Sequence, residues 1–595
     1  MTAYLAPVRD MEFVLRELAG LDEIAALPGY EDASWELVAS VLEEAGRIAG
    51  EVLAPLNQTG DRQGARLIDG KVGTAEGWGT AYRTLAEGNW IGLAATPQYG
   101  GMGLPSVVNI AVSEMWQAAN MAFALCPMLS QGAYNAISEC GSAEQKAAFL
   151  PRLASGEWCG TMNLTEAAAG SDLGAIRTKA AKSGDHYLIS GQKIFITYGD
   201  HQLTENIVHL VLARTPDAPP GVKGISLFIV PKFLVNADGS LGARNDVHCV
   251  SLEHKMGIHA SPTAVMAFGD RGGAVGYLVG EENRGLEYMF VMMNHARLNV
   301  GLQGLAIAER AYQQALAYAR ERIQGKPIGC SEKSAIIGHP DVRRMLMTMK
   351  ARVEAMRALS YVAAAALDKA HSHPSPEQRA ATKRYAEFLN PIVKGWCTET
   401  GNEVASLGVQ VHGGMGYIEE TGAAQHLRDA RITTIYEGTT AIQANDLINR
   451  KLLRDQGVEA RQALDEVAGL AEDLSHQSDD DLRTIGRALR QGAETASRAV
   501  AWLLTAAGED PRLPAAASVP LLMLLGTVLG GHQLARAAVA ARRHLEAGNG
   551  DPSFHAAKLK TARFYADNLL PQAAGLLGAA TDGARSVIAL DDDQF

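Results

Sequence analysis

The sequence predicts an α+β fold in which helices, a β domain, more helices and a further helical domain follow one another along the chain. Three observations predict it. The chain has 595 residues, too many for one hydrophobic core, so three or four domains are expected. Apolar residues recur at helical spacing on both sides of a central stretch. That stretch is made of short β-branched and aromatic runs separated by turn residues.

The domain boundaries are placed where this pattern changes. Residues 1–156 are predicted to form an N-terminal helical domain, of which WELVASVLEEAGRIAGEVLAPLN is typical. Residues 157–281 are predicted to form a middle β domain, because HYLISGQKIFIT, NIVHLVLART and GISLFIVPKF are strand-like and TPDAPPGVKG is a turn connection. Residues 282–450 return to long helical patterns such as AERAYQQALAYARERIQG. Residues 451–595 are predicted to be an additional helical domain rich in Ala and Leu.

The composition argues against several classes of protein. A hydrophobic content of 47% and a charged content of 20% are those of an ordinary soluble globular protein. The net charge of -12 disfavours nucleic acid or an anionic membrane as a partner. Six scattered cysteines without a CxxC pair argue against a zinc site or a disulfide framework, so no metal is expected. The first residues, MTAYLAPVRDMEF, are charged where a signal peptide needs an apolar run, which predicts a cytoplasmic protein.

One segment is long enough to span a bilayer. No Asp, Glu, Lys or Arg lies between Arg512 and Arg536. Prolines, glycines and His532 interrupt it, and its continuous apolar part is only Val519 to Leu529. A buried bundle helix is therefore predicted, and a membrane-associated protein is the alternative.

The first motif that could carry chemistry runs from Asn163 to Asp172 with the sequence NLTEAAAGSD. It follows a strand-like run and opens a loop of small residues. Such a loop allows backbone N–H groups and hydroxyls to approach a phosphate or a ring edge closely. A Gly-Ser-Asp sequence alone is usually only a turn.

The second motif runs from Gln410 to Tyr417 with the sequence QVHGGMGY. It lacks the GxGxxG spacing and lies in a helical region, so a nicotinamide-binding Rossmann unit is not expected. His412 has no partner at metal-ligand spacing and is interpreted as a structural or solvated histidine.

The third motif runs from Arg431 to Thr440 with the sequence RITTIYEGTT. Glu437 is flanked by apolar residues and glycine, and burial there would raise the pKa of its carboxyl group. A general base needs such tuning. Alone, an exposed turn glutamate would be the simpler interpretation.

Together, the three motifs resemble those of the acyl-CoA dehydrogenase family, in the same order and over about residues 30–450. The resemblance implies the family fold, with a four-helix bundle in the third domain, and FAD as the cofactor. It implies that Glu437 is the catalytic base. Glu437 takes the α-proton of an acyl-CoA thioester while the β-hydride passes to the flavin, giving the trans-2-enoyl-CoA. A few members place their base immediately before the arginine at position 297, where this chain has Ala296.

The resemblance also implies which residues bind FAD and substrate. FAD-contacting positions are expected at Met162, Leu164, Thr165, Gly170, Ser171, Phe195, Ile196, Thr197, Arg322, Gln410, Gly413, Gly414 and Thr439. Substrate-contacting positions are expected at Ser171, Asn294, Arg297 and Gly438. Thr197 corresponds to the residue facing flavin N5, and Gln410, Gly413 and Gly414 to residues that contact a partner subunit's FAD. A shared cofactor site of this kind implies a homodimer or homotetramer.

The chain departs from the family pattern at five positions. They are Asn163 for a smaller residue, Phe195 for tryptophan, Asn294 for aspartate, Gly325 for phenylalanine and Gln425 for a basic residue.

The tail beyond residue 450 resembles that of longer family members. The extended N-terminus, the RIQG element and the stretch EETGAAQHLRDARITTIYEGT are most similar to bacterial 3-methylmercaptopropionyl-CoA dehydrogenases. The expected substrate is therefore 3-methylmercaptopropionyl-CoA, and the expected electron acceptor is electron-transferring flavoprotein.

Other functions stay open. A general fatty acyl-CoA dehydrogenase of β-oxidation and an acyl-CoA oxidase would use the same residues. A DNA-associated flavoprotein of this fold needs a basic surface, but residues 451–595 contain 15 Lys+Arg against 19 Asp+Glu, so no nucleic-acid partner is expected.

Overall fold

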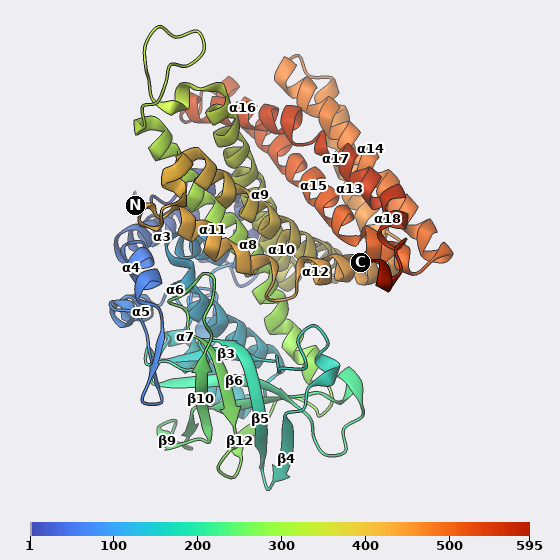
Figure 1. Ribbon diagram of the computed structural model, residues 1–595. Helices are drawn as coiled ribbons and strands as arrows, with labels where there is room; N and C mark the ends of the chain where they lie inside the picture. Colours follow the sequence, from blue (N-terminus) through green and yellow to red (C-terminus); the bar gives the residue numbers. More distant parts are fainter. Residues whose placement is uncertain (1–2) are drawn as a thin grey trace. The chain divides into compact units, whose positions relative to one another are not determined.

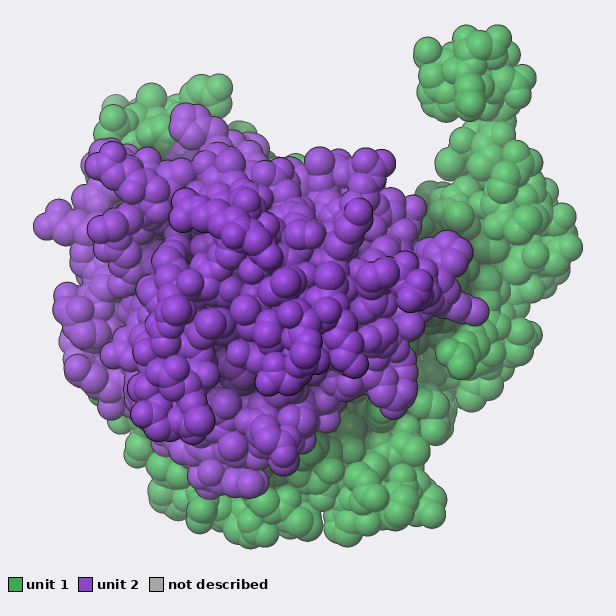
Figure 2. All heavy atoms as spheres, turned by 90° about the horizontal axis from the view of Figure 1, so that it is seen from below, with its two compact units in different colours: residues 1–46, 105–114, 300–595 green, residues 47–104, 115–299 purple. Residues whose placement is uncertain are grey.

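The computed structural model describes residues 3–595 and divides into two compact units, coloured separately in Figure 2. We call Arg47–Leu104 with Met115–Asn299 the sheet unit. We call Met1–Gly46, Pro105–Glu114 and Val300–Phe595 the bundle unit. The predicted α+β fold, with helices before and after a central β region and further helices at the end, is confirmed (Figure 1).

An eight-stranded sheet dominates the sheet unit, in the order β10-β11-β5-β12-β7-β6-β3 with β4 paired to β5. All pairs are antiparallel except β3 with β6. β6 and β7 are buried along their whole length, as expected for continuous apolar runs. The strands are β3 (Trp158–Asn163), β4 (Lys179–Ser183), β5 (His186–Thr197), β6 (Asn206–Ala213), β7 (Ser226–Pro231), β10 (Val247–Leu252), β11 (Thr263–Phe268) and β12 (Ala274–Leu278).

β5 extends the sheet in two directions because it bends at Gly191. The residues before the bend pair with β4 and β12, and those after it pair with β11. Gly191 has a φ of 152°, and a Cβ there would lie 2.6 Å from Thr178 Oγ1. Only glycine fits this close approach. Phe195–Thr197 lie at the end of β5 that pairs with β11.

Two short hairpins accompany the main sheet, β1 (Arg66–Ile68) with β2 (Lys71–Gly73) and β8 (Phe233–Val235) with β9 (Leu241–Arg244). The first hairpin lies in the region predicted to be helical. Its turn is formed by Asp69 and Gly70, with φ of 50° and 71°. Positive φ at both central residues is the requirement of the tightest hairpin turns, which favour Asp-Gly.

The helices of the sheet unit pack beside these strands. Trp78 Nε1 donates to Tyr198 Oη at 3.1 Å, and Tyr198 Oη donates to the Ala122 carbonyl at 2.8 Å. Tyr198 directly follows β5, so these bonds fix the end of that strand to α5 and α6. The helices are α4 (Pro55–Gln63), α5 (Trp78–Glu87), the larger part of α6 (Ser106–Cys140), α7 (Ala143–Ser155) and the first part of α8 (Gly285–Glu321).

All named elements of the bundle unit are helices, joined by loops of which the longest follows α8. Its helices are α1 (Val8–Glu17), α2 (Leu21–Ala25), most of α3 (Trp35–Ile48), the rest of α8, α9 (Pro340–Ser372), α10 (Pro376–His412), α11 (Ala423–Arg431), α12 (Thr440–Asp446), α13 (Val458–Ser475), α14 (Asp480–Glu509), α15 (Arg512–Ala547), α16 (Pro552–Asn568), α17 (Gln572–Ala580) and α18 (Asp582–Val587). Long helices α9 and α10 pack together, and α15 of the extra domain packs against both (Figure 1).

Helix α10 is held between α8 and α15 by glycine contacts. A Cβ at Gly304 of α8 would lie 2.3 Å from the Cys397 carbonyl oxygen. A Cβ at Gly526 of α15 would lie 2.2 Å from Trp396 Cγ, and one at Gly530 would lie 2.7 Å from Trp396 Cη2. Because glycine has no side chain, these helices approach α10 more closely than any other residue would allow.

A buried charge network joins α1, the first helix of the bundle unit, to α16 near its end. Arg357 is 1% exposed and binds Glu114, Asp10 and Glu309 at 2.5–2.7 Å. Lys558 of α16 pairs with the same Asp10. Burial raises the pKa of Asp10, but the charges of Lys558 and Arg357 outweigh it and hold the pKa below its usual range.

Helix α15 contains the segment that is long enough to span a bilayer. Of the helices described, it alone is long and apolar enough, and 72% of its most apolar window is buried. The helix therefore has the pattern of a core helix, which is what the sequence predicts.

Candidate active site

The loop that carries Glu437 joins η8 (Ile432–Thr434) to α12 in the bundle unit. Glu437 has a φ of 55° and Gly438 a φ of 86°, so two consecutive residues adopt the left-handed conformation. A Cβ at Gly438 would lie 2.8 Å from Gln443 Nε2. A non-glycine residue in this region costs on the order of 1–3 kcal/mol, and such strain is typical of functional sites.

Side chains from α8, α10 and α12 hold this loop. Lys394, which is fully buried on α10, donates from Nζ to the Gly438 carbonyl at 2.6 Å. Gln443 Nε2 donates to the Glu437 carbonyl at 2.9 Å. The Tyr436 hydroxyl donates to Gln303 Oε1 on α8. The carbonyls of Glu437 and of the next residue, Gly438, are thus both bound by side chains. Sequence reasoning missed Lys394, Gln443 and Gln303, whose sequence context carries no motif.

Thr439 has a structural role that the structure shows directly. It is the N-cap of α12, and its side chain accepts from the Ile442 N–H at 3.3 Å. Burial raises the pKa of the neighbouring Tyr436 phenol, with the charge of Glu437 as the next cause, so Tyr436 stays a neutral hydrogen-bond donor.

The other predicted residues of the bundle unit lie where α8 and α10 end. Arg322 follows α8 and is exposed, as are Gln410, Gly413 and Gly414 at the end of α10. The two ends are adjacent, because Tyr318 stacks on His412 with ring centroids 4.5 Å apart. A Cβ at Gly413 or Gly414 would meet nothing within 4 Å, so the space beside both glycines is open.

In the sheet unit, the loop after β3 is anchored by a buried ion pair. Glu166 accepts from Lys193 Nζ at 2.8 Å, and Lys193 also donates to the Leu164 carbonyl at 2.9 Å. Burial lowers the pKa of Lys193 to about 8, against the opposing effect of Glu166. The Thr165 carbonyl accepts from the Ile194 N–H at 2.9 Å. Met162–Thr165 is therefore tied to β5, and the Lys193–Glu166 pair is a feature that sequence reasoning did not find.

The end of β5 presents an aromatic ring. Phe195 is 59% exposed and has a φ of 60°, whereas the next residue, Ile196, is 2% exposed. Thr197 is half-buried and pairs with Thr263 of β11. A large aromatic side chain held in a strained conformation and left exposed is expected where a flat apolar ligand packs. Gly170 and Ser171, further along the β3 loop, are also exposed.

Asn294 and Arg297 lie one turn apart on the part of α8 that belongs to the sheet unit. Asn294 is exposed, whereas Arg297 is 6% exposed and its guanidinium lies 5.6 Å from the Phe290 ring centroid. Ala296 between them is buried.

The structure thus brings the predicted residues together in groups. The β3 loop joins the end of β5 in the sheet unit, and Arg322 joins Gln410–Gly414 in the bundle unit. Glu437, Gly438 and Thr439 form a third group on their own loop. In the sheet unit, the exposed Phe195 ring fits the packing of a flat ring. In the bundle unit, the open space beside Gly413 and Gly414 fits the approach of a phosphate group.

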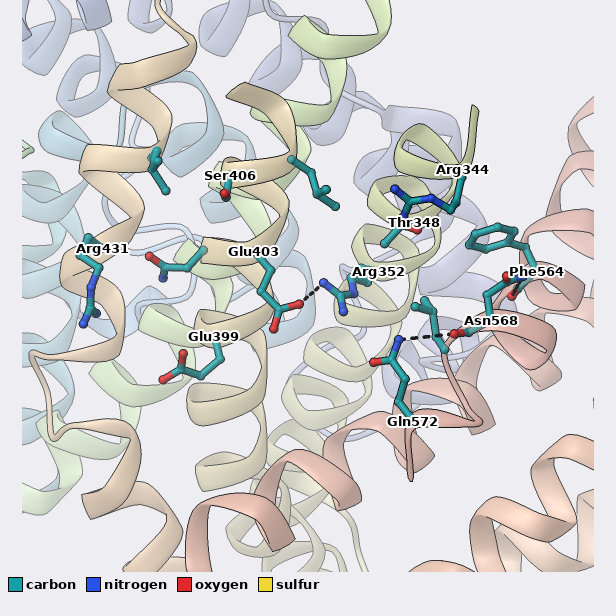
Figure 3. Close-up of a pocket in the computed structure, with 14 residues that line it drawn as sticks. Arg344, Thr348, Arg352, Glu399, Glu403, Ser406, Arg431, Phe564, Asn568 and Gln572 are labelled. Carbon is teal, nitrogen blue, oxygen red and sulfur yellow. Dashed lines mark hydrogen bonds and ion pairs between the residues drawn. The ribbon is translucent and has the colours of Figure 1, made fainter. Parts of the chain in front are cut away.

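A cavity of about 810 Å³ lies between α9, α10 and α11 on one side and α16 with the following turn on the other (Figure 3). The Arg352–Glu403 ion pair crosses it. None of the predicted site residues lines this cavity. Glu399 lines the cavity, and its carboxylate accepts from the hydroxyl of Thr440, the first residue of α12. The cavity therefore lies near the α12 end of the Glu437 loop, and Glu437 itself does not line it.

Four family models match consecutive parts of the chain. The N-terminal domain of acyl-CoA dehydrogenase matches residues 39–157, the middle domain 161–270 and the C-terminal domain 283–452. A model described as acetyl-CoA dehydrogenase C-terminal like matches residues 463–591.

Curated relatives match along the whole chain. The 3-methylmercaptopropionyl-CoA dehydrogenase of Ruegeria pomeroyi is 50% identical over 588 residues, which is 98% of this chain and 99% of that protein. A broad-specificity linear acyl-CoA dehydrogenase of Mycobacterium tuberculosis is 36% identical over 96% of each chain.

Solved structures share the fold. A Bacillus anthracis acyl-CoA dehydrogenase complexed with FAD has a TM-score of 0.73 at 22% identity, covering 96% of this chain and 91% of its own. A structure reported for electron transferring flavoprotein of Acidaminococcus fermentans has a TM-score of 0.57 at 29% identity, covering 70% of this chain and 98% of its own.

Proposed function

The chain belongs to the acyl-CoA dehydrogenase family, and on this premise we propose that it oxidises 3-methylmercaptopropionyl-CoA to the trans-2-enoyl thioester. The observation that carries the proposal is the 50% identity over 98% of the chain to a relative of that name. The extra C-terminal domain is included in that match. A dehydrogenase of ordinary straight-chain acyl-CoAs is the second candidate, supported by the broad-specificity relative at 36% identity.

FAD is the cofactor, and the residues present fit it. Thr165, Phe195 and Thr197 of the sheet unit would hold the ring system. Gln410 and the glycines after it would hold the phosphates of a partner subunit's FAD, because backbone N–H groups flanked by glycine approach a phosphate closely. When bound, FAD accepts the hydride from the β-carbon of the substrate.

Glu437 removes the α-proton of the thioester. An α C–H is a weak acid, so the thioester carbonyl must be polarised as the proton leaves, and the Glu437 backbone N–H is one donor for it. Gln443 and Lys394 hold the carbonyls of Glu437 and Gly438, which limits the movement of the loop that carries this donor. Fixed donors stabilise developing negative charge without the reorganisation that water would need.

The electrons taken from the substrate leave to an electron-transferring flavoprotein, and the enzyme works in the cytoplasm. Six scattered cysteines without a CxxC pair suit a reducing cytosol, and the likeness to the Acidaminococcus structure supports the acceptor. An acyl-CoA oxidase would pass the electrons to dioxygen instead. Substrate-dependent oxygen consumption with peroxide formation at the rate of turnover would favour the oxidase.

A homodimer or homotetramer completes the cofactor site. Exposed apolar side chains lie just after α10 and in the segment that follows α8, namely Ile323, Ile328, Met415, Tyr417 and Ile418. Tyr417 is 84% and Ile328 90% exposed. Apolar surface of this kind is typical of subunit interfaces.

The experiment on substrate measures kcat/KM with the purified enzyme and an artificial electron acceptor. It compares the thioether substrate, 3-methylmercaptopropionyl-CoA, with butyryl-, octanoyl- and palmitoyl-CoA. We expect the thioether to be oxidised, with short straight chains also accepted. One methylene in an apolar pocket is worth about 1–3 kcal/mol, or roughly 10–200-fold, so its thioether replacement should differ from a matched straight chain by less. A strong preference for palmitoyl-CoA, with negligible activity on the thioether, would overturn the proposed substrate. The proposed dehydrogenation would stand.

A further inference from the structure

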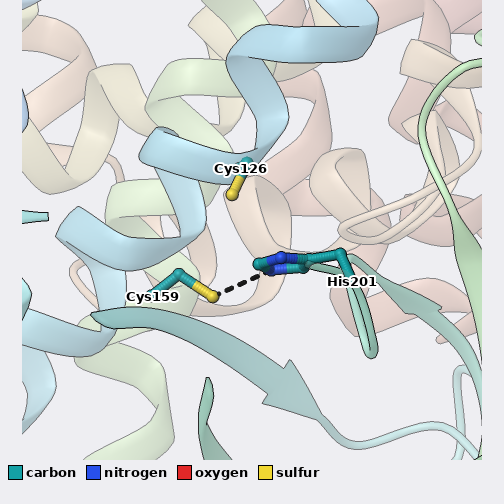
Figure 4. Close-up of side chains that lie close together, drawn as sticks. All are labelled: Cys126, Cys159 and His201. Atoms are coloured by element: carbon teal, nitrogen blue, oxygen red, sulfur yellow. Dashed lines mark hydrogen bonds between the residues drawn. The ribbon is translucent and has the colours of Figure 1, made fainter. Parts of the chain in front are cut away.

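A buried cluster of two cysteines and a histidine lies in the sheet unit, and none of the three is a predicted site residue. Cys126 is on α6, Cys159 on β3, and His201 in the loop after β5 (Figure 4). Their reactive atoms all lie within 4.8 Å of one another, and Cys159 Sγ is 3.0 Å from His201 Nε2. Each residue is 0–1% exposed. Such a cluster can hold a metal ion, or it can be a pair of thiols with redox chemistry.

The second nitrogen of His201 distinguishes the two possibilities. The Leu203 backbone N–H donates to His201 Nδ1 at 3.1 Å, so Nδ1 is an acceptor. A neutral imidazole has one N–H, which must therefore be on Nε2 and points at the Cys159 sulfur. Histidines that bind metals do the opposite, since their second nitrogen donates to an acceptor. The ring is therefore arranged to donate to sulfur, not to coordinate an ion.

Cys159 is the more reactive of the two thiols. Burial raises the pKa of Cys159, but hydrogen bonds from Cys126, His201 and Thr204 oppose it, and the pKa lies well below its usual range. Burial and the neighbouring sulfur raise the pKa of Cys126. A thiolate is the nucleophilic form of cysteine, and the adjacent thiol is placed to react with an oxidised Cys159.

We propose that Cys126 and Cys159 form a dithiol modification site that hydrogen peroxide or an organic hydroperoxide oxidises to an intrachain disulfide. The Cys159 sulfur attacks one peroxide oxygen, the O–O bond breaks, and a sulfenic acid and one water or alcohol form. The Cys126 sulfur then displaces the hydroxyl group of the sulfenic acid as water, and the S–S bond forms. In total two thiol protons and two electrons pass to the peroxide.

The cluster is connected to both cofactor-facing segments of the sheet unit. Cys159 precedes Met162–Thr165 on the same strand, and Cys126 lies one turn after Ala122, whose carbonyl binds Tyr198 at the end of β5. Drawing α6 and β3 together therefore shifts both segments. Resting on the proposed function, we expect the oxidised enzyme to bind FAD more weakly and to recover when a dithiol reductant opens the bond.

The test treats the full-length holoenzyme with hydrogen peroxide, blocks the remaining thiols after unfolding, and maps the peptides by mass spectrometry. The six cysteine thiols should fall to four, with one linked pair of peptides containing Cys126 and Cys159. This readout does not depend on turnover, so it stands even if the proposed substrate is wrong. A pair linked through any other cysteine, or no faster oxidation of Cys159 than of Cys397, would overturn the proposal.

Three variants sharpen the result. In Cys126→Ala the Cys159 sulfenic acid has no thiol to react with and should be trapped by a 1,3-dione probe. In Cys159→Ala, Cys126 should stay reduced. Cys397→Ala is the control, because Cys397 is equally buried but its sulfur contacts the Ser360 hydroxyl at 4.0 Å. Stoichiometric zinc or copper in the wild type that is absent from Cys159→Ala would show a metal site and overturn the proposal. If a variant does not fold, the peptide map of the wild-type protein alone decides whether the Cys126–Cys159 disulfide forms.

Discussion

At the scale of single residues, Glu437 combines a strained backbone with a chemically suitable side chain. Its φ is in the left-handed region, and Gln443 and Lys394 bind its own carbonyl and that of Gly438. A base that is held in one orientation loses little entropy when it meets its proton, which is what positioned general bases contribute.

Glu437→Gln tests this residue. The amide keeps the size and most hydrogen bonds of the carboxylate but cannot accept the α-proton, so kcat should fall by about 10²–10⁴-fold. FAD and acyl-CoA binding should remain. Rapid-mixing measurement of flavin reduction in a single turnover checks it, with Glu420→Gln as a control on an exposed glutamate. A near-wild-type rate of flavin reduction in Glu437→Gln would show that another group is the base.

Lys394 is a positioning residue, because it holds the loop that carries Glu437. Replacing it tests whether the lysine affects turnover or only the stability of the fold. Hydrogen bonds to charged groups are worth about 1.5–3 kcal/mol, so Lys394→Met should lower kcat by roughly 10–100-fold with a smaller effect on KM. Lys394→Arg keeps a donor for the Gly438 carbonyl and should recover part of kcat. If Lys394→Met melts at a lower temperature but turns over normally, the lysine has only a structural role.

At the scale of helices and strands, the contact between α10 and α15 determines where Lys394 lies. The glycines of α15 press on Trp396, two residues after Lys394 on the same helix. The packing of the extra domain is thereby transmitted to the helix that supports the Glu437 loop.

Gly526→Ala should disturb this contact. A Cβ there would overlap the Trp396 ring, and overpacking a dense core costs about 1–3 kcal/mol. Gly469→Ala on α13 is the matched control, because that glycine is exposed and its Cβ would meet nothing within 4 Å. Alanine in an exposed helical position should stabilise by about 0.5–1 kcal/mol. Thermal melting followed by circular dichroism should therefore move in opposite directions for the two variants, and equal shifts would contradict the packing argument.

Sequence patterns predicted secondary structure well where the apolar pattern of the segment itself determines it. HYLISGQKIFIT corresponds to β5, residue for residue, and NIVHLVLART contains all of β6. The β1–β2 hairpin was missed although its signal, Asp69-Gly70 between short strands, is present. The supports of the site could not be predicted. Lys394 and Gly438 are 44 residues apart, as Cys159 and His201 are 42 apart, and only folding brings such pairs together. The predicted binding residues and domain boundaries stay predictions.

At the scale of the whole molecule, the charge network around Asp10 links the start of the chain to α16. Breaking a buried pair by removing one partner typically costs about 3–5 kcal/mol, so Lys558→Met should lower the melting temperature clearly. Lys560→Met, on the exposed face of the same helix, should leave it nearly unchanged.

The same variant should change the response to acid. The pKa of Asp10 is lower in the folded than in the unfolded protein, so its stabilisation is present above the unfolded pKa near 4 and is lost as the pH falls through the folded value. Without Lys558 the folded pKa of Asp10 rises towards the unfolded value, so less stabilisation remains to be lost in acid. Between pH 6 and 3 the melting temperature of Lys558→Met should therefore fall less than that of the wild type, and parallel curves for variant and wild type would contradict the assignment.

The glycine contacts on Trp396 bear on whether the last helical domain can be removed from the enzyme. The Acidaminococcus structure aligns with 70% of this chain, so the fold exists elsewhere without the last domain. Here, however, a Cβ at Gly395 would lie 2.8 Å from Leu522, and the Trp396 ring is buried under two glycines of α15. Cutting the chain after residue 452 would expose this tryptophan and an apolar face of α10 to water. We therefore expect that deleting the last domain alone does not give a stable short enzyme, because α10 needs the contact with α15 to keep its apolar face buried.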